Sequence, residues 1–117
     1  MNVEALRDYC IGKLHATESL PFGPENLVMK IGGKMFALIS LDANPASINL
    51  KCDPALAEQL REEFSAVLPG YHMNKTHWNT VLMEPSIKWV QVQEWIDHSY
   101  YLVRNSLPKV VKAELDR

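Results

Sequence analysis

The stretch Leu27-Val28-Met29-Lys30-Ile31-Gly32-Gly33-Lys34-Met35-Phe36-Ala37-Leu38-Ile39 decides the fold of this chain. It contains two short apolar runs on either side of a glycine pair. This pattern predicts a β-hairpin, because glycine readily adopts the positive φ angles of tight hairpin turns. A two-residue turn would place Lys34 opposite Ile31, whereas a three-residue turn would move Lys34 into the loop and change which residues face the core. The sequence leaves both registers open.

Further strands follow the hairpin. Apolar and polar residues alternate over residues 47–52, which is typical of a strand with one buried face. The apolar set is Ile48, Leu50 and Cys52, and the polar set is Ser47, Asn49 and Lys51. Residues 75–83 alternate in the same way, with Trp78, Thr80 and Leu82 on one face and His77, Asn79, Val81 and Met83 on the other. Because short turns join consecutive strands, we expect an antiparallel sheet.

Three segments have apolar residues at helical spacing and predict helices over about 3–13, 54–64 and 88–105. Asn2 and Asp53 are suitable N-caps for the first two helices, and Pro54 suits the first helical position. Residues 16–26 predict a loop or an extended edge segment, 67–69 a short strand, and the tail after Pro108 a frayed helical turn. We therefore expect a single α+β domain over 1–117, with an antiparallel sheet and helices packed on one face.

The composition excludes several classes of protein. The chain has 117 residues, a hydrophobic fraction of 47%, a formal net charge of −2 and a pI of about 6.1. This mild acidity argues against strong non-specific binding to nucleic acid, although an uneven spread of charge still permits a local basic face. The first residues predict a helix start and not a signal peptide, and no long uncharged apolar run is present, so we expect a monomer in the cytoplasm that does not contact membranes.

The sequence contains no motif that fixes a catalytic or metal-binding chemistry. Cys10 and Cys52 lie in apolar periodic settings, so we expect reduced, inert core thiols. His72 and His77 are five positions apart, which does not match the spacing of two ligands on one strand face or helix face. We expect no enzyme activity and no cofactor.

The polar stretch from Pro69 to Thr80 holds two histidines, two asparagines, a lysine, a tyrosine and a tryptophan. No acidic residue occurs between Phe64 and Met83. Polar and aromatic side chains at this density predict a surface that faces a partner.

Several motifs together resemble the MmcQ/YjbR family of small bacterial proteins, over nearly the whole chain. The motifs are Pro21–Pro24, Gly33–Leu38, Asn49–Pro54, Pro69–Lys75 with His77-Trp78, and Ile96–Tyr100. The resemblance implies a fold like bacterial frataxin, CyaY, and a "double wing" DNA-binding motif. It carries over no catalytic residues.

The candidate site is the sheet face that the helices leave open, with the polar stretch at its entry. The predicted binding residues are Lys30, Lys34, Asn49, Lys51, Tyr71, His72, Asn74, Lys75, His77 and Trp78. Lysines attract phosphate, asparagine can read a base edge, and the aromatic residues can stack on a base. DNA is the first hypothesis, and the alternative is a non-enzymatic adaptor module that binds a protein or small ligand on the same face. Glutamates of the second helix on the far side would favour DNA, whereas Asp42 or Glu84 at the open face would favour a ligand.

Overall fold

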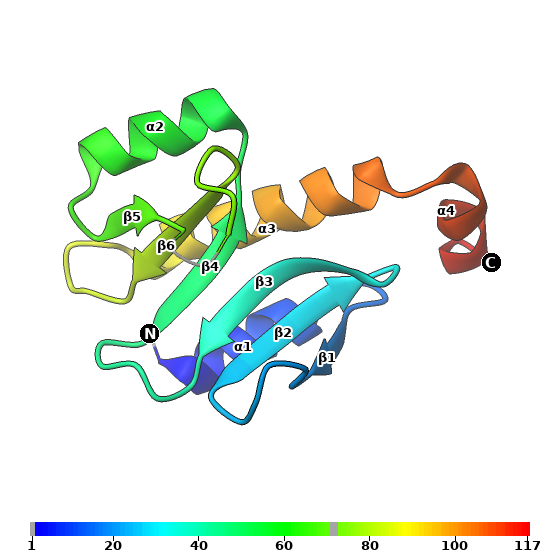
Figure 1. Cartoon of the computed structure of the whole chain (residues 1–117), viewed down its shortest axis with the longest axis horizontal. Coiled ribbons are helices and arrows are strands. Elements are labelled where there is room, and N and C mark those ends of the chain that lie inside the picture. Colours follow the sequence, from blue (N-terminus) through cyan, green and yellow to red (C-terminus); the bar gives the residue numbers. More distant parts are fainter. Residues whose placement is uncertain (1, 71–72) are drawn as a thin grey trace.

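A computed structural model of the chain describes residues 2–70 and 73–117. Within this part of the chain, six strands form one sheet in the order β1-β2-β3-β4-β6-β5, and every neighbouring pair is antiparallel (Figure 1). The strands are β1 (Thr17–Ser19), β2 (Asn26–Ile31), β3 (Lys34–Ser40), β4 (Ser47–Lys51), β5 (Val67–Pro69) and β6 (Trp78–Leu82). The helices are α1 (Val3–Ile11), α2 (Pro54–Glu63), α3 (Trp89–Ser106) and α4 (Lys109–Leu115). None of the helices in the described ranges is long and apolar enough to cross a bilayer.

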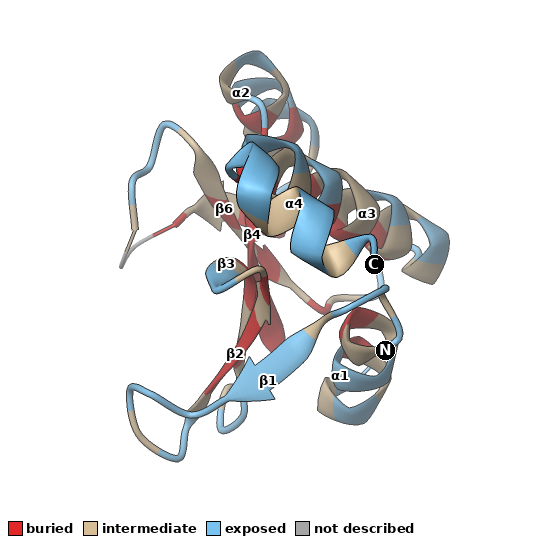
Figure 2. Cartoon of the chain, turned by 90° about the vertical axis from the view of Figure 1, so that its right-hand side faces the viewer, coloured by how far each residue is buried: buried red, intermediate tan, exposed pale blue. Residues whose placement is uncertain are grey.

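The helices cover one face of the sheet, and the opposite face is open (Figure 2). Helix α3 packs on β2, β3 and β4, α1 packs on β3, and α2 packs on β5 and β6. Helices α2 and α3 meet on this face, where the rings of Phe64 and Trp95 lie 5.3 Å apart. The predicted α+β class, with an antiparallel sheet and helices on one side, is therefore confirmed. The likeness to frataxin stays a prediction.

The hairpin between β2 and β3 has the two-residue turn. Ile31 pairs with Lys34, and Gly32 and Gly33 have φ angles of 58° and 81°, as a type I′ turn requires. The register then shifts, because Lys30 pairs with Met35 but Met29 pairs with Ala37. This β-bulge leaves one extra residue on β3. Phe36 and Ala37 are consequently both buried on the helix side.

A serine of α3 satisfies the backbone at this bulge. The Ser99 hydroxyl donates to the carbonyl of Phe36 at 2.6 Å and accepts from the backbone N–H of Lys51 at 2.9 Å. Ser99 is fully buried, so each of these bonds replaces a contact with water that the polar group has lost. The hydroxyl therefore fixes α3 across β3 and β4.

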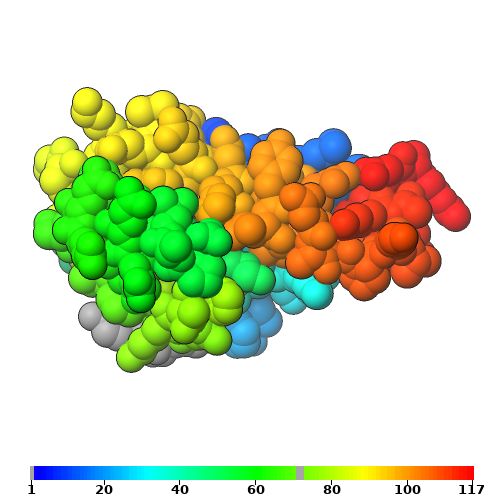
Figure 3. Space-filling view, turned by 90° about the horizontal axis from the view of Figure 1, so that it is seen from above, coloured from blue at the N-terminus to red at the C-terminus, as the bar shows by residue number. Residues whose placement is uncertain are grey.

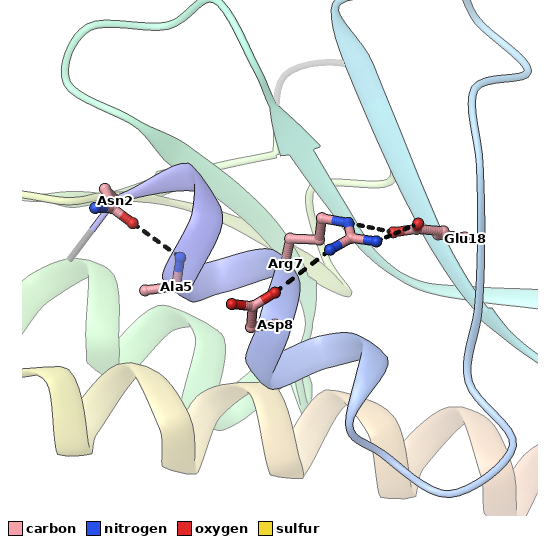
Figure 4. Close-up of polar contacts among 5 residues, drawn as sticks. All are labelled: Asn2, Ala5, Arg7, Asp8 and Glu18. Atoms are coloured by element: carbon pink, nitrogen blue, oxygen red, sulfur yellow. Dashed lines mark hydrogen bonds and ion pairs between the residues drawn. The ribbon is translucent and has the colours of Figure 1, made fainter.

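A local signal sets the start of α1 as predicted. The Asn2 side chain accepts from the backbone N–H of Ala5 at 2.8 Å and caps α1 (Figure 4). Figure 4 also shows Arg7 of α1 donating to both carboxylate oxygens of Glu18 on β1, at 2.8 and 2.7 Å. This bidentate pair joins the first helix to the edge strand.

The segment predicted as a loop or an extended edge contains β1, which is an edge strand of the sheet, and the tail predicted as a frayed helical turn forms the short helix α4. The structure differs from the prediction at the ends of two elements. Helix α1 ends at Ile11, before Lys13. Strand β6 begins at Trp78 and not at Lys75, because Asn74 organises a turn there: its side chain accepts from Thr76 N–H, and its carbonyl accepts from Trp78 N–H.

Candidate functional site

Two lysines lie on the open face at the end of the sheet where the glycine turn is. Lys30 pairs with Met35, and Lys51 pairs with Trp78. Lys51 alternates with the buried Leu50, and Lys30 lies between buried Met29 and Ile31, so both lysines point away from the helices. We call Lys30, Met35, Lys51 and Trp78 the lysine row. All four are half-buried, so their side chains lie along the face.

A hollow of about 380 Å³ adjoins the lysine row on the open face. Its lining residues are Phe22, Asn26, Met35, Leu38, Ser40, Asn49 and Met73. Strands β2, β3 and β4 supply the floor, while two loops supply Phe22 and Met73. In the view from above, the β1–β2 loop in blue and the segment before β6 in light green project on the same side of the molecule (Figure 3). The hollow is therefore a shallow pocket with walls from two loops.

The floor of the hollow carries uncharged polar groups. Asn49 is only 9% exposed, and its carbonyl oxygen accepts from the hydroxyl of Thr80 on β6. This bond uses one lone pair of the oxygen, so the NH₂ group and the second lone pair of the Asn49 amide could meet a ligand. Ser40 and Asn26 pair across β3 and β2 at the opposite end from the lysine row. The floor thus offers an amide, a hydroxyl and a further amide around Leu38.

Charge is distributed unevenly along the open face. Three acidic residues belong to loops at the end away from the lysines: Glu25 precedes Asn26 of β2, Asp42 follows β3, and Glu84 follows β6. The carbonyl of Glu25 accepts from the N–H of Leu41 at 2.7 Å, which holds two of these loops together. A ligand on this face would therefore meet cations at one end and carboxylates beyond the other.

Four of the predicted site residues come together on the open face: Lys30, Asn49, Lys51 and Trp78. Lys34 pairs with the buried Ile31, so its side chain leaves the strand on the helix side of the sheet. Tyr71 and His72 lie outside the described residues.

The other predicted residues occupy the loop between β5 and β6. Asn74 forms the turn before β6, and His77 contributes its carbonyl to the N–H of Cys52. Lys75 lines a separate hollow of about 240 Å³ beside α2, together with Pro54, Glu58, Arg61 and Thr76. The structure therefore places Lys75 close to a glutamate of α2 and away from the hollow on the open face.

A glycine brings this loop close to the lysine row. Gly70 donates its N–H to the carbonyl of Trp78 at 3.0 Å. A Cβ atom at position 70 would lie 2.9 Å from Trp78 Cβ and 3.1 Å from its carbonyl oxygen. Only glycine permits this approach of the two strands without displacement of backbone, which explains the Pro69-Gly70 pair.

Sequence reasoning missed most of the lining of the hollow, namely Phe22, Asn26, Met35, Leu38, Ser40 and Met73. The bulge places Met35 and Leu38 on the same open face, and no residue type in the sequence indicates a bulge there. Phe22 carried a signal, because a large aromatic residue among Pro21, Gly23 and Pro24 has few neighbours along the chain to cover it. Its side chain is 65% exposed.

The thiols lie away from this face and are poor nucleophiles. Cys10 and Cys52 are free and buried, as predicted. Burial raises the pKa of Cys10 to about 12 and that of Cys52 to about 11, so both remain protonated near neutral pH. His98 lines a small cavity with Cys52, but its Nε2 accepts from the N–H of Asp53 at 3.2 Å. Among the described residues, no group of three His, Cys, Asp or Glu side chains could hold a metal ion.

Comparisons with known proteins agree on one family. The family model described as YjbR matches residues 12–102. The "Uncharacterized protein YjbR" of Escherichia coli K12 is 34% identical over 109 residues, which cover 93% of this chain and 92% of the relative. The "Uncharacterized protein YbdF" of Escherichia coli O157:H7 is 42% identical over 89 residues, covering 76% and 73%. The crystal structure of Deinococcus radiodurans protein DR2400 superposes with a TM-score of 0.92 at 35% identity, over 98% of this chain and 88% of that one. A crystal structure of a Pseudomonas syringae protein gives a TM-score of 0.77 at 27% identity, over 88% and 99%.

Proposed function

We propose that this protein, which belongs to the YjbR family, is a non-catalytic cytoplasmic module that binds single-stranded nucleic acid on the open face of its sheet. The observation that carries the proposal is the lysine row beside the hollow. Cations for phosphate and an apolar surface for a base occur there side by side. These are the two components by which proteins hold single strands.

The shape of the face favours a single strand over a duplex. In a duplex the bases are stacked inside, and a protein meets phosphates and groove edges. A hollow bounded by Phe22 and Met73 suits a base that is free to leave the stack. The chain provides only two lysines in the row, so the salt dependence should be shallow. Each neutralised phosphate of a single strand contributes a slope of about 0.7 in the log-log plot.

The position of α2 removes one objection to a polyanionic partner. Its glutamates Glu58, Glu62 and Glu63 are exposed, but α2 packs on the helix side of the sheet. They therefore do not face the lysine row, and a net charge of −2 is compatible with a locally cationic surface.

A small anionic ligand is the second candidate function. The carboxylates of Glu25, Asp42 and Glu84 belong to loops at the far end of the face and would repel a strand that continued in that direction. A volume of about 380 Å³ also falls within the range of small-molecule pockets. Such a ligand would place its anionic group at the lysine row and its apolar part in the hollow.

The proposed function can be tested by fluorescence anisotropy with labelled single-stranded and duplex oligonucleotides over a salt series. Lys30→Ala and Lys51→Ala should each lower the slope by about 0.7 and weaken all sequences alike. Lys34→Ala is the matched control, because this lysine belongs to the same hairpin but its side chain leaves the strand on the helix side of the sheet. Absence of binding by either oligonucleotide at micromolar protein in low salt would reject the proposal. An unchanged slope in both site variants would mean that another surface binds.

A further inference from the structure

We infer that the hollow on the open face is a base pocket, in which one nucleobase stacks on Phe22 and presents its edge to Asn26, Ser40 and Asn49. The inference rests on the proposed function and extends it from backbone attraction to recognition of the base. The same chemistry could come from a base within a strand or from a free nucleotide, and the experiment below separates the two sources.

The walls of the hollow come from opposite corners of the sheet. Phe22 belongs to the loop that joins β1 and β2 at the acidic end, and Met73 belongs to the loop that precedes β6 at the lysine end. Figure 2 shows the β1–β2 loop projecting on the side of the sheet away from the helices. A phenyl ring and a flexible thioether on either side of a slot can contact both faces of a planar ring.

Phe22 is the more informative of the two. Its side chain is 65% exposed although it lines the hollow, so most of the ring contacts solvent in the free protein. The loop around it is short and contains two prolines, and the hydrogen bond from Leu41 N–H to Glu25 carbonyl anchors its end. The backbone that carries the ring is restrained in this way, so stacking of a second ring has mainly to order the side-chain torsions of Phe22.

The floor selects the kind of ligand. Asn26, Ser40 and Asn49 present neutral donors and acceptors, and none carries a charge. An acyl chain in the hollow would cover these groups without hydrogen-bonding them, which is unfavourable. The edge of a nucleobase carries donors and acceptors in the same plane as its apolar ring, so it matches both the floor and the walls. The volume is at the low end for ligand pockets, which suits one base and not two stacked bases.

The lysine row fixes the direction of the nucleotide. Lys30 pairs with Met35, which belongs to both the row and the hollow, and Lys51 lies two residues beyond Asn49 on the same face of β4. A base in the hollow would therefore have its phosphate at the lysines and away from Glu25, Asp42 and Glu84. This orientation uses the unequal charge of the two ends of the face.

The test compares wild type, Phe22→Ala and Leu20→Ala, using single-stranded homopolymers of about eight nucleotides and the corresponding nucleoside monophosphates. Leu20 is the control because it lies in the same segment and is 50% exposed, but it does not line the hollow. Affinity is measured by anisotropy, and the side-chain NH₂ signals of Asn26 and Asn49 are followed by NMR. Phe22→Ala should weaken oligonucleotide binding about 5- to 150-fold with an unchanged salt slope, and the NH₂ signals should shift in wild type and in Leu20→Ala only.

Each outcome decides between the two proposals. If oligonucleotides bind wild type and both variants equally, the base pocket is wrong while strand binding stands. If monophosphates bind in a Phe22-dependent way and the oligonucleotides bind no tighter, the pocket stands, its ligand is a free nucleotide, and the proposed strand binding fails. If neither kind of ligand binds or shifts the NH₂ signals, both proposals are wrong.

Discussion

The glycine turn between β2 and β3 allows a paired test of how α4 is held. Gly32 and Gly33 both have positive φ angles, so alanine is conformationally unfavourable at either position. Their neighbours differ. A Cβ atom at Gly32 would lie 2.6 Å from Leu107 Cδ1 and 3.0 Å from Val111 Cγ1, whereas a Cβ atom at Gly33 would have nothing within 4 Å. The difference between Gly32→Ala and Gly33→Ala therefore measures how the turn packs against Leu107, which lies between α3 and α4, and against Val111 of α4.

The size of this difference follows from the contacts. The left-handed conformation costs a non-glycine residue about 1–2 kcal/mol, and both variants bear it. The new Cβ of Gly32→Ala meets both methyl groups of Leu107, at 2.6 and 3.1 Å, and Val111 Cγ1 at 3.0 Å, so two side chains must move to relieve the contact. Leu107 is buried, so α4 must shift or the core must strain. Overpacking of this kind costs about 1–3 kcal/mol, which is the expected excess of Gly32→Ala over Gly33→Ala.

Urea unfolding followed by circular dichroism gives the free energy of unfolding of each variant. The double variant Gly32→Ala/Leu107→Ala completes the test, because removal of the Leu107 methyl groups should recover part of the excess as a coupling energy. Equal free energies for Gly32→Ala and Gly33→Ala, with no coupling to Leu107, would refute the packing of the α3–α4 junction against the turn.

Three further predictions concern the core. Leu50→Ala should lower the free energy of unfolding by about 2–5 kcal/mol, because Leu50 is 2% exposed beneath the helices; a loss below about 0.5 kcal/mol on urea unfolding would contradict the assignment of strand faces. Cys10 and Cys52 should react with a thiol reagent at neutral pH only as fast as the protein opens, and rapid labelling of the native protein would overturn their burial. Above pH 9 the folded state should lose stability, because the unfolded Cys10 thiol ionises there while burial keeps its folded pKa at about 12. The folded state then binds more protons than the unfolded state, so the free energy of unfolding falls as pH rises, by up to about 1.4 kcal/mol per pH unit. Cys10→Ala should remove this contribution to the pH dependence.

Strands and helices with a periodic pattern could be predicted from the sequence. Alternation of Ile48 and Leu50 with Asn49 and Lys51 predicts the correct face of β4, because a strand has a period of two residues. The bulge at Phe36 could not be predicted in this way. It depends on contacts between strands and on the Ser99 hydroxyl, which lies 63 positions further along the chain. The formation of α4 likewise depends on packing against the Gly32 turn, since a seven-residue helix has little stability alone.

For the candidate site, residues in regular strands could also be predicted from the sequence, whereas residues in loops could not. Lys51 and Trp78 could be placed on one face because each lies in a regular strand. Lys75 could not, because the turn formed by Asn74 directs the chain towards α2. Phe22 and Met73 are distant in sequence and line the same hollow only because β2, β3 and β4 lie side by side between their loops. Loop residues that line the hollow can therefore be identified only from the three-dimensional arrangement of the strands.

If the open face binds a nucleotide as proposed, its composition predicts which part of the nucleotide it recognises. A surface that bound phosphate alone would need several cations and few apolar groups. Here the half-buried Leu38 and Met35 line the hollow on this face, with Met35 beside Lys30. Under the proposed function, these apolar side chains would contact the base, whereas the lysines would contact the phosphate. With only two lysines in the row, most of the selectivity on this face should come from the hollow, and affinity should respond more to the identity of the base than to salt.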